Sequence, residues 1–253
     1  MSIAYEHDKN IHTLEGARTA LPIILEGMNP ASLLDVGCGI GTWLNAATEF
    51  GIADFLGLDG VAISPEKLLI PYDRFKCQDL TTSWSLNRRF DVVICFEVAE
   101  HLDEKSSKHL IQSIVAHSDN VLFSAACPGQ DGQHHINCQW PEYWQYIFNT
   151  QGFVCDDAVR WRIWNLESIE PWYRQNMFLA IRSTEKAGFE KRIESVVHPE
   201  MLKWLSIDQT DECKSELTRR IEDGAARAGW FSTTPAKALW RKLKSRVASR
   251  YSK

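Results

Sequence analysis

The residue types best suited to chemistry gather in one short stretch, Phe90 to Leu102, which reads FDVVICFEVAEHL. Its apolar first half predicts a buried strand that ends at Glu97, with Glu100 and His101 three and four residues further on. Residues at these spacings share one face where a helix begins. Two carboxylates and an imidazole on one face provide half of a divalent-metal site.

A later loop, from Cys127 to Trp144, carries two more histidines, His134 and His135. It leaves the carboxyl end of a predicted strand, where open α/β sheets bind ligands. Either histidine can complete a metal site, or can act without a metal as the general base that takes a proton from a hydroxyl. His109 and His117, on the helix between the two stretches, are expected at the surface.

A glycine-rich turn must position a ligand beside these groups, and Leu33 to Trp43 (LLDVGCGIGTW) predicts one. A buried strand enters the turn, three glycines stand at alternate positions, and a helix-compatible stretch follows. Glycine suits such a turn because the backbone needs unusual φ values and passes close to the ligand. The dinucleotide fingerprint would require glycine at Thr42, which disfavours an NAD-dependent enzyme. The candidate ligand-binding residues of the turn are Asp35, Gly37, Cys38, Gly39 and Gly41.

Acidic residues also follow the next two predicted strands. Asp59 lies 18 residues after Gly41, the distance at which one βα unit returns the chain to the neighbouring strand end. A carboxylate there can accept both hydroxyls of a ribose, and the alternative is a plain Asp-Gly turn. Asp79 follows the third strand. We expect an apolar rim of low dielectric constant around these acids. Its residues are Cys38, Leu80 and Phe96.

Apolar spacing predicts alternating strands and helices, the pattern of a doubly wound α/β sheet. A helix is expected within 12–28, with Pro22 as a kink or boundary. Further helices are expected over 43–50, after Asp103 and from Pro141, and helices are also expected beyond residue 183. The predicted strands are 54–58, 74–77, 92–96, 121–125, 153–161 and 177–181, in addition to the one before the glycine turn.

The order acidic–x–G–x–G–x–G after a first strand resembles motif I of the class I S-adenosylmethionine-dependent methyltransferases. The resemblance covers about residues 12–183 and implies a seven-stranded sheet with its last strand antiparallel. It implies S-adenosylmethionine as cofactor and gives Asp79 the role of binding the adenine amino group. We therefore expect an N-terminal helical segment over 1–30, a methyltransferase domain over 31–183 and a helical extension over 184–253.

The segment FEVAEHL is similar to the E-V-x-E-H segment of small-RNA 2′-O-methyltransferases and of ubiquinone-pathway O-methyltransferases. That likeness implies a bound Mg²⁺ or Mn²⁺ that grips vicinal hydroxyls. Its ligands would be Glu97, Glu100, His101 and His135. Many class I methyltransferases keep E-H here as a helix start without metal, so His134, His135 and His101 are also candidates for metal-free catalysis.

The loop after the fifth strand and the run from Trp172 to Asn176 resemble bacterial methyltransferases of glycan and natural-product pathways. Aromatic faces beside amide and guanidinium donors suit a sugar ring, although tryptophans such as Trp140 and Trp144 also suit core packing. We therefore expect an O-methyltransferase acting on a sugar or glycan hydroxyl. The alternatives are an RNA ribose 2′-O-methyltransferase and a cofactor-binding regulatory partner of a glycan-assembly enzyme without turnover.

Composition and charge narrow the class of protein. The 253 residues suit one core with additions, no apolar run is long enough to cross a membrane, and the start lacks the order of a signal peptide. Seven cysteines without a C-x-x-C pair indicate buried thiols in a cytoplasmic protein. Residues 235–253 hold seven basic side chains and no acidic one, which leaves 21 basic against 33 acidic residues elsewhere. The excess of acidic residues over 1–234 disfavours nucleic acid as a partner, because nucleic acid is itself negatively charged.

The basic C-terminal stretch has its own pattern. Apolar residues recur every three or four positions over 236–251, and lysines and arginines fill the other positions. This predicts a basic amphipathic helix that lies on an anionic membrane surface or on an acidic protein face. The alternative is that its apolar stripe packs on the protein's own body.

Overall fold

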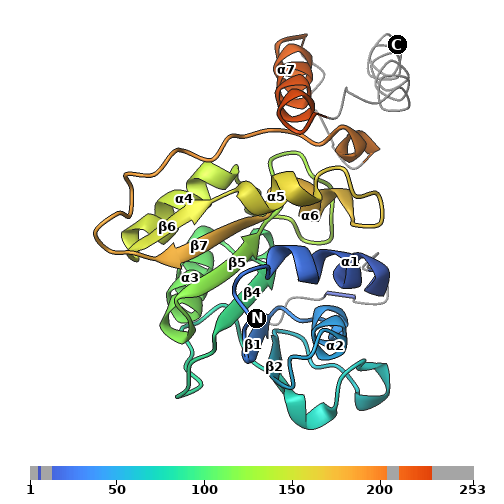
Figure 1. The fold of residues 1–253 in the computed structure, drawn as a ribbon, viewed down its shortest axis with the longest axis vertical. Coiled ribbons are helices and arrows are strands. Elements are labelled where there is room, and N and C mark those ends of the chain that lie inside the picture. Colours follow the sequence, from blue (N-terminus) through green and yellow to red (C-terminus); the bar gives the residue numbers. More distant parts are fainter. Residues whose placement is uncertain (1–4, 7–12, 204–210, 230–253) are drawn as a thin grey trace.

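The computed structural model describes residues 5–6, 13–203 and 211–229, and these form a seven-stranded sheet between two layers of helices (Figure 1). The strand order is β3-β2-β1-β4-β5-β7-β6. The first five strands are parallel, and β7 runs antiparallel to both β5 and β6. This confirms the predicted α/β sheet and its antiparallel last strand. The strands are β1 (Ser32–Val36), β2 (Asp54–Asp59), β3 (Phe75–Cys77), β4 (Val92–Phe96), β5 (Asn120–Ser124), β6 (Phe153–Asp156) and β7 (Phe178–Arg182).

The helices cover the two faces of the sheet. The helices are α1 (Leu14–Ile24), α2 (Thr42–Glu49), α3 (Glu104–His117), α4 (Pro141–Thr150), α5 (Ala158–Ile163), α6 (Pro171–Asn176) and α7 (Asp211–Arg227). Apolar residues of α3 and α4 form the core of one face, and those of α1, α2, α5 and α6 form the core of the other. Short 3₁₀ turns lie at Pro65–Lys67, Tyr72–Arg74, Ala99–His101 and Pro199–Lys203.

Strand β4 shows why these strands read as unbroken apolar runs. All five of its residues are buried. Val93 and Cys95 pack in the core beneath α3 and α4, whereas the alternate residues pack toward α1 and α2. A parallel strand covered on both faces needs apolar side chains at every position, not at every second one.

The predicted strand over 153–161 is wrong in its second half. β6 ends at Asp156, whose Oδ1 accepts a hydrogen bond from the backbone N–H of Ala158 at 2.7 Å. The chain turns there into α5, which places Trp161 against Trp164 with ring centroids 4.9 Å apart. The apolar residues of this segment alternated only loosely, and residues three apart on a helix can mimic that pattern.

The expectation that His117 lies at the surface is also wrong, because only 2% of this residue is exposed. Its Nε2 accepts a hydrogen bond from the Leu86 backbone N–H at 2.9 Å, and its Nδ1 lies 2.6 Å from the Ser113 carbonyl oxygen. The ring stacks on Trp84 with centroids 4.7 Å apart. Both ring nitrogens and one ring face therefore serve the packing beneath α3.

A third apolar cluster joins the C-terminal segment, by which we mean the described residues from 184 onward, to the sheet domain. Its buried members are Cys127, Trp164, Val196, Val197, Met201, Leu202, Leu217, Ile221 and Ala225. Helix α7 therefore packs against this cluster, which includes Trp164 directly after α5. Figure 1 shows α7 beyond α5, on the side away from α1. The predicted amphipathic helix over 236–251 lies outside the described residues. Among the described helices, none combines the length and apolarity required to cross a bilayer.

Candidate active site

A cavity of about 340 Å³ opens at the carboxyl ends of β1, β2, β3 and β4. Four carboxylates line it, one from each strand end, and among the described residues that line it there is no lysine or arginine. Parallel strands bring their ends together at one edge of the sheet, which explains why residues far apart in sequence meet here. The lining carboxylates are Asp35, Asp59, Asp79 and Glu97.

The glycine turn forms the floor of this cavity. The backbone N–H groups of Gly37 and Cys38 donate to the Leu58 carbonyl oxygen at 2.7 and 2.9 Å, which ties the turn to β2. Gly37 has φ of 81°, and a Cβ there would lie 2.2 Å from Cγ2 of Val98. Part of the need for glycine therefore comes from the protein's own packing.

The other two glycines have different positions in the turn. Gly39 lines the cavity, whereas Gly41 lies outside the lining and precedes α2 as its N-cap with φ of 90°. A Cβ on Gly41 would lie 2.8 Å from Cγ1 of Ile70. The structure therefore brings Gly37, Cys38 and Gly39 to the cavity but not Gly41.

Asp35 and Asp59 lie on neighbouring strands at the centre of the site. Asp35 is 2% exposed and its Oδ2 has no hydrogen-bond partner among the described residues. Burial, and then the nearby Asp59 charge, raise the pKa of Asp35 well above its ordinary value. Asp59 is anchored because its two oxygens accept from the backbone N–H groups of Gly39 and Val61, each at 2.8 Å. An unsatisfied buried carboxylate oxygen is costly and suits a site that awaits a polar ligand.

Asp79 lies at the outer edge of the cavity, after β3. Its Oδ1 accepts hydrogen bonds from the backbone N–H of Thr81 at 2.8 Å and from the Thr81 hydroxyl at 2.6 Å. These donors lower the pKa of Asp79 and keep it ionised. The predicted apolar rim of Cys38, Leu80 and Phe96 also lines the cavity.

Glu97 begins the turn after β4 in a left-handed backbone conformation, with φ of 55°. Its carboxylate accepts from the side-chain amide of Gln130 at 2.8 Å and from that of Asn176 at 3.2 Å. Burial raises its pKa, and these two amide donors act in the opposite direction. Glu97 is therefore directed at the cavity by two amide groups from distant parts of the chain.

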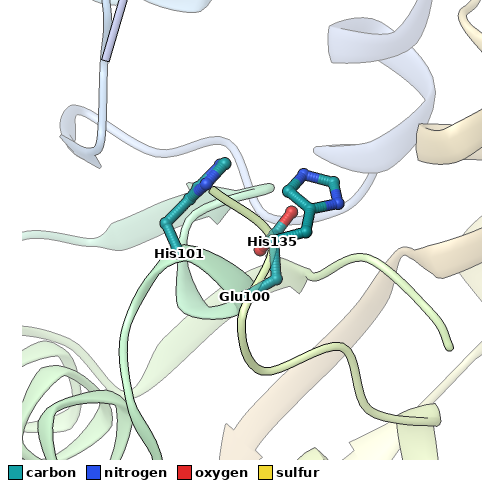
Figure 2. Close-up of side chains that lie close together, drawn as sticks. All are labelled: Glu100, His101 and His135. Atoms are coloured by element: carbon teal, nitrogen blue, oxygen red, sulfur yellow. The ribbon is translucent and has the colours of Figure 1, made fainter. Parts of the chain in front are cut away.

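Glu100, His101 and His135 form a second group (Figure 2). One oxygen or nitrogen from each lies within 4.8 Å of the others. Glu100 is fully buried, and among the described residues neither of its oxygens has a hydrogen-bond partner of ordinary geometry. Burial, and then the Glu97 charge, raise its pKa well above the usual range. Burial, together with His135, lowers the pKa of His101 to about 4.

His135 is held with one nitrogen available. Its Nδ1 lies 2.9 Å from the Gln130 carbonyl oxygen, so Nδ1 donates this hydrogen bond and Nε2 takes no part in it. His134, the next residue, is exposed and lies outside the group. The structure thus brings together three of the four predicted metal ligands. Glu97 is outside this group of donor atoms and has its own amide partners, but its carboxylate interacts with that of Glu100.

Several residues of the site were not predicted from the sequence. Tyr5 contacts the His101 ring edge-on at a centroid distance of 5.0 Å, and Trp43 and Tyr173 line the cavity with it. Gln130 carries no motif, and only its position in the fold identifies it. Tyr173 and Asn176 belong to the run expected to face a sugar, but their contacts with the cavity and with Glu97 were not predicted. Thr81 could have been found from its place two residues after Asp79, since a hydroxyl there commonly closes a turn.

The run from Trp172 to Asn176, which was expected to face a sugar, points mainly inward. Arg174, Gln175 and Asn176 are each at most 2% exposed, and Arg174 pairs with Glu200 at 2.7 Å. Trp144, at 1% exposure, belongs to the core. Of the residues from Trp172 to Asn176, Tyr173 is the one that lines the cavity.

Comparison with known proteins agrees with this geometry. The methyltransferase domain family matches residues 10–175. The structure is similar to DesVI from Streptomyces venezuelae, with a TM-score of 0.53 and 14% identity over 67% of this chain and 92% of that one. It is also similar to the sugar N-methyltransferase KedS8 from a Streptoalloteichus species, with a TM-score of 0.51 and 15% identity over 70% and 89% of the two chains. No curated protein sequence matches the chain. The chain belongs to the methyltransferase domain family, within the class I S-adenosylmethionine-dependent methyltransferases.

Proposed function

We propose that the protein transfers a methyl group from S-adenosylmethionine to a hydroxyl of a sugar or glycan. The observation that carries the proposal is an acidic cavity that adjoins, through His101, a group of two half-buried imidazoles and one buried carboxylate. S-adenosylmethionine supplies a methyl group on a positively charged sulfur. The remaining requirements are to hold the cofactor, orient the hydroxyl and remove its proton.

The residues of the cavity fit this cofactor. Asp59 would accept the ribose hydroxyls through its remaining lone pairs, since each carboxylate oxygen accepts more than one hydrogen bond. Asp79 would accept from the adenine amino group at the β3 edge. The unpartnered Oδ2 of Asp35 would receive a donor from the amino-acid part of the cofactor. A cavity without lysine or arginine among its described lining suits a cationic ligand.

Proton removal falls to the histidines. A hydroxyl must lose its proton as it is methylated, and a base can take it only in the unprotonated form. His101, with a pKa of about 4, is neutral at pH 7. The Nδ1 of His135 is engaged with the Gln130 carbonyl, so Nε2 is the nitrogen that would take the proton. His135 is our candidate for the base because its other nitrogen is held by the Gln130 carbonyl.

A metal ion would give the same three residues a second way to act. Glu100, His101 and His135 offer one oxygen and two nitrogens from within 4.8 Å of one another. Glu100 is a buried carboxylate that forms no ion pair among the described residues. A cation would satisfy that carboxylate and would grip hydroxyls of the acceptor. Two imidazoles favour a transition metal such as Mn²⁺ over Mg²⁺.

The side chains that line the same cavity favour an uncharged or cationic acceptor. The aromatic rings of Tyr5, Trp43, Phe96 and Tyr173 line the cavity, and such faces stack on sugar rings. Phosphate-rich acceptors call for basic side chains near the site. RNA is therefore the weaker candidate.

A transfer assay tests the proposal. Labelled S-adenosylmethionine is offered with nucleotide sugars, oligosaccharides and small RNAs, with a chelator or with added Mn²⁺ or Mg²⁺. Label on a sugar oxygen supports the proposal. Label on RNA alone would replace it with ribose methylation, and cofactor binding without transfer to any of them would favour a regulatory partner.

Chelation separates the two ways of removing the proton. If activity is lost with chelator and returns with Mn²⁺, the metal assists. If activity survives chelation but is lost in His135→Ala, the histidine acts alone as the base.

A further inference from the structure

We propose that Gln175 and Asn176 are positioning residues for the Glu97 carboxylate. We further propose that His198–Glu200, within the C-terminal segment, set the arrangement of these two side chains. Glu97, so held, would make the cavity discriminate the cationic cofactor from its neutral demethylated product. The inference rests on the proposed cofactor site, and it does not depend on the acceptor.

The hydrogen bonds at Glu97 form the first link. The Asn176 amide donates to Glu97 Oε1 at 3.2 Å and to Gln130 Oε1 at 3.1 Å, while the Gln130 amide donates to Glu97 Oε2 at 2.8 Å. Asn176 and Gln130 are 2% and 7% exposed, so water does not replace these donors. Each carboxylate oxygen therefore has its own amide donor, which fixes the plane of the carboxylate.

The orientation of the amides follows from one group that can only donate. The backbone N–H of His198 donates to Gln175 Oε1 at 2.8 Å, so the Gln175 amide nitrogen must point the other way. That nitrogen donates to Asn176 Oδ1 at 2.9 Å, which turns the Asn176 nitrogen toward Glu97. The His198 N–H thus sets the amide orientation of Gln175, and through it that of Asn176. We call this chain of hydrogen bonds, from His198 through Gln175 and Asn176 to Glu97, the relay.

The start of the relay is itself rigid. His198 is fully buried, and its Nε2 lies 2.9 Å from the Trp164 carbonyl oxygen. Arg174, next to Gln175, pairs with Glu200 at 2.7 Å, with its own side chain 1% exposed. The segment is therefore anchored on both sides of the point where it contacts Gln175.

The position of Glu97 gives the relay its purpose. In the sheet order, β4 is separated from β3 by two strands, so Glu97 and Asp79 lie at opposite sides of the cavity. With the nucleoside at the ends of β2 and β3, the sulfur must lie toward β4. A carboxylate on that side attracts a sulfonium and has no such interaction with a neutral thioether.

Calorimetry with S-adenosylmethionine and S-adenosylhomocysteine, in the presence of chelator, tests the proposal. Because a charge-assisted contact to one ligand is lost, Glu97→Gln should weaken S-adenosylmethionine binding about tenfold and S-adenosylhomocysteine binding less than about twofold. Asn176→Leu, and Gln175→Met, which nearly keeps the volume, should shift the same ratio by about threefold, since the Glu97 carboxyl group remains but loses the donor that orients it.

Gln145→Met is the matched control. Gln145 is also buried, and it also ties the C-terminal segment to the domain, through Glu190, the Lys191 carbonyl and the Ile193 N–H, but it has no link to Glu97. This variant should change thermal stability and leave the ligand ratio at the wild-type value. If Gln175→Met fails to fold, Gln130→Met removes the other donor to Glu97 without touching the C-terminal segment and should shift the ratio alike.

Two results would overturn the inference. The first is an equal loss of affinity for both ligands in Glu97→Gln, since the carboxylate would then not sense the sulfur charge. The second is a Gln175→Met variant that behaves like Gln145→Met. Neither result depends on finding an acceptor, so a negative transfer assay would remove the proposed function without deciding the relay.

Discussion

The two adjacent histidines after β5 have different surroundings, and this difference allows a matched test. His135 lies against Glu100 and His101 (Figure 2). Its ring also occupies the space over Gly132, where a Cβ would come within 2.1 Å of Nε2. His134 is exposed and outside this group. The neighbours therefore differ in contact with the site, although they share residue type and loop.

We expect His135→Ala to lower the transfer rate by about 10²–10⁴-fold, the usual contribution of a positioned acid or base. His134→Ala should stay within about twofold of wild type, because surface substitutions rarely disturb a site. Cofactor affinity, measured by calorimetry, should be unchanged in both variants. Equal activity of the two variants would exclude His135 from proton removal and from any metal site needed for turnover.

At this scale, the sequence was informative where parallel strands end. Asp35 and Asp59 could be predicted because each lies at the end of a readable apolar strand, and strand ends converge. Asp79 follows the short strand β3, and its role was implied by the family resemblance. The place of Tyr5 at the cavity and the contact of Asn176 with Glu97 could not be predicted. Both depend on tertiary packing, of an N-terminal segment and of α6, and packing leaves no periodic signal in one sequence.

At the scale of elements, the glycine turn between β1 and α2 is the most constrained connection. Gly37 combines φ of 81° with a Cβ position 2.2 Å from Val98. Gly51, after α2, has φ of 104° but no atom within 4 Å of the position its Cβ would take. The pair separates backbone strain from steric overlap.

Gly37→Ala should lower the free energy of unfolding by about 2–5 kcal/mol, from left-handed strain of about 1–2 and overpacking of about 1–3. Gly51→Ala should show only the strain, about 1–2 kcal/mol. Urea unfolding followed by tryptophan fluorescence measures both. The double variant Gly37→Ala/Val98→Ala should lose less free energy of unfolding than the sum of the losses in the two single variants, because Val98→Ala removes the side chain that the new Cβ would overlap. Strictly additive losses would contradict the overlap.

Elements were predictable where periodicity was strong and ambiguous where it was weak. β4, buried at all five positions, could be read directly from FDVVICF. The segment after β6 could not, since Val159 and Trp161 suit a strand as well as a helix. The hydrogen bond from Ala158 N–H to Asp156 Oδ1 decided the outcome, and such a local side-chain bond competes with strand pairing without altering the apolar pattern.

At the scale of the whole molecule, the charge is unevenly distributed along the chain. Residues 235–253 carry seven basic side chains, against 21 basic and 33 acidic residues in the rest. We propose that this stretch holds the protein at an anionic membrane surface, where each basic residue contributes on the order of 1 kcal/mol. The predicted helix over 236–251 is outside the described residues, so the proposal rests on the sequence alone.

Flotation with anionic liposomes tests this proposal. The full chain should float at low salt and sink at high salt, because salt screens the attraction. A version ending at Thr234 should sink in both. If the two versions float equally, or if neither floats, the stretch packs on protein and the membrane proposal fails.

Stability should depend on pH through the buried His198, which links the C-terminal segment to the domain. Its Nδ1 accepts from the Glu200 backbone N–H at 3.2 Å and its Nε2 faces the Trp164 carbonyl, so its hydrogen bonds require the neutral ring. Burial, and then the Arg174 charge, lower the pKa of His198 to about 3. In the unfolded chain the ordinary value of about 6.5 returns.

The unfolded chain therefore binds a proton at His198 that the folded chain does not, over the range from about pH 6.5 down to about pH 3, so the stability contributed by this histidine falls as the pH falls. The buried Asp35 and Glu100, whose pKa values are raised, act in the opposite direction. Each such histidine contributes up to about 1.4 kcal/mol per pH unit, and His101, with its pKa of about 4, acts in the same direction. Urea unfolding at pH 7.0, 6.0 and 5.0 measures the slope. His198→Gln should flatten it by about one such increment, whereas His109→Gln, on the partly exposed face of α3, should keep it. A His198→Gln variant with the wild-type slope would mean that His198 takes up its proton without unfolding, and that the C-terminal segment tolerates a charged ring.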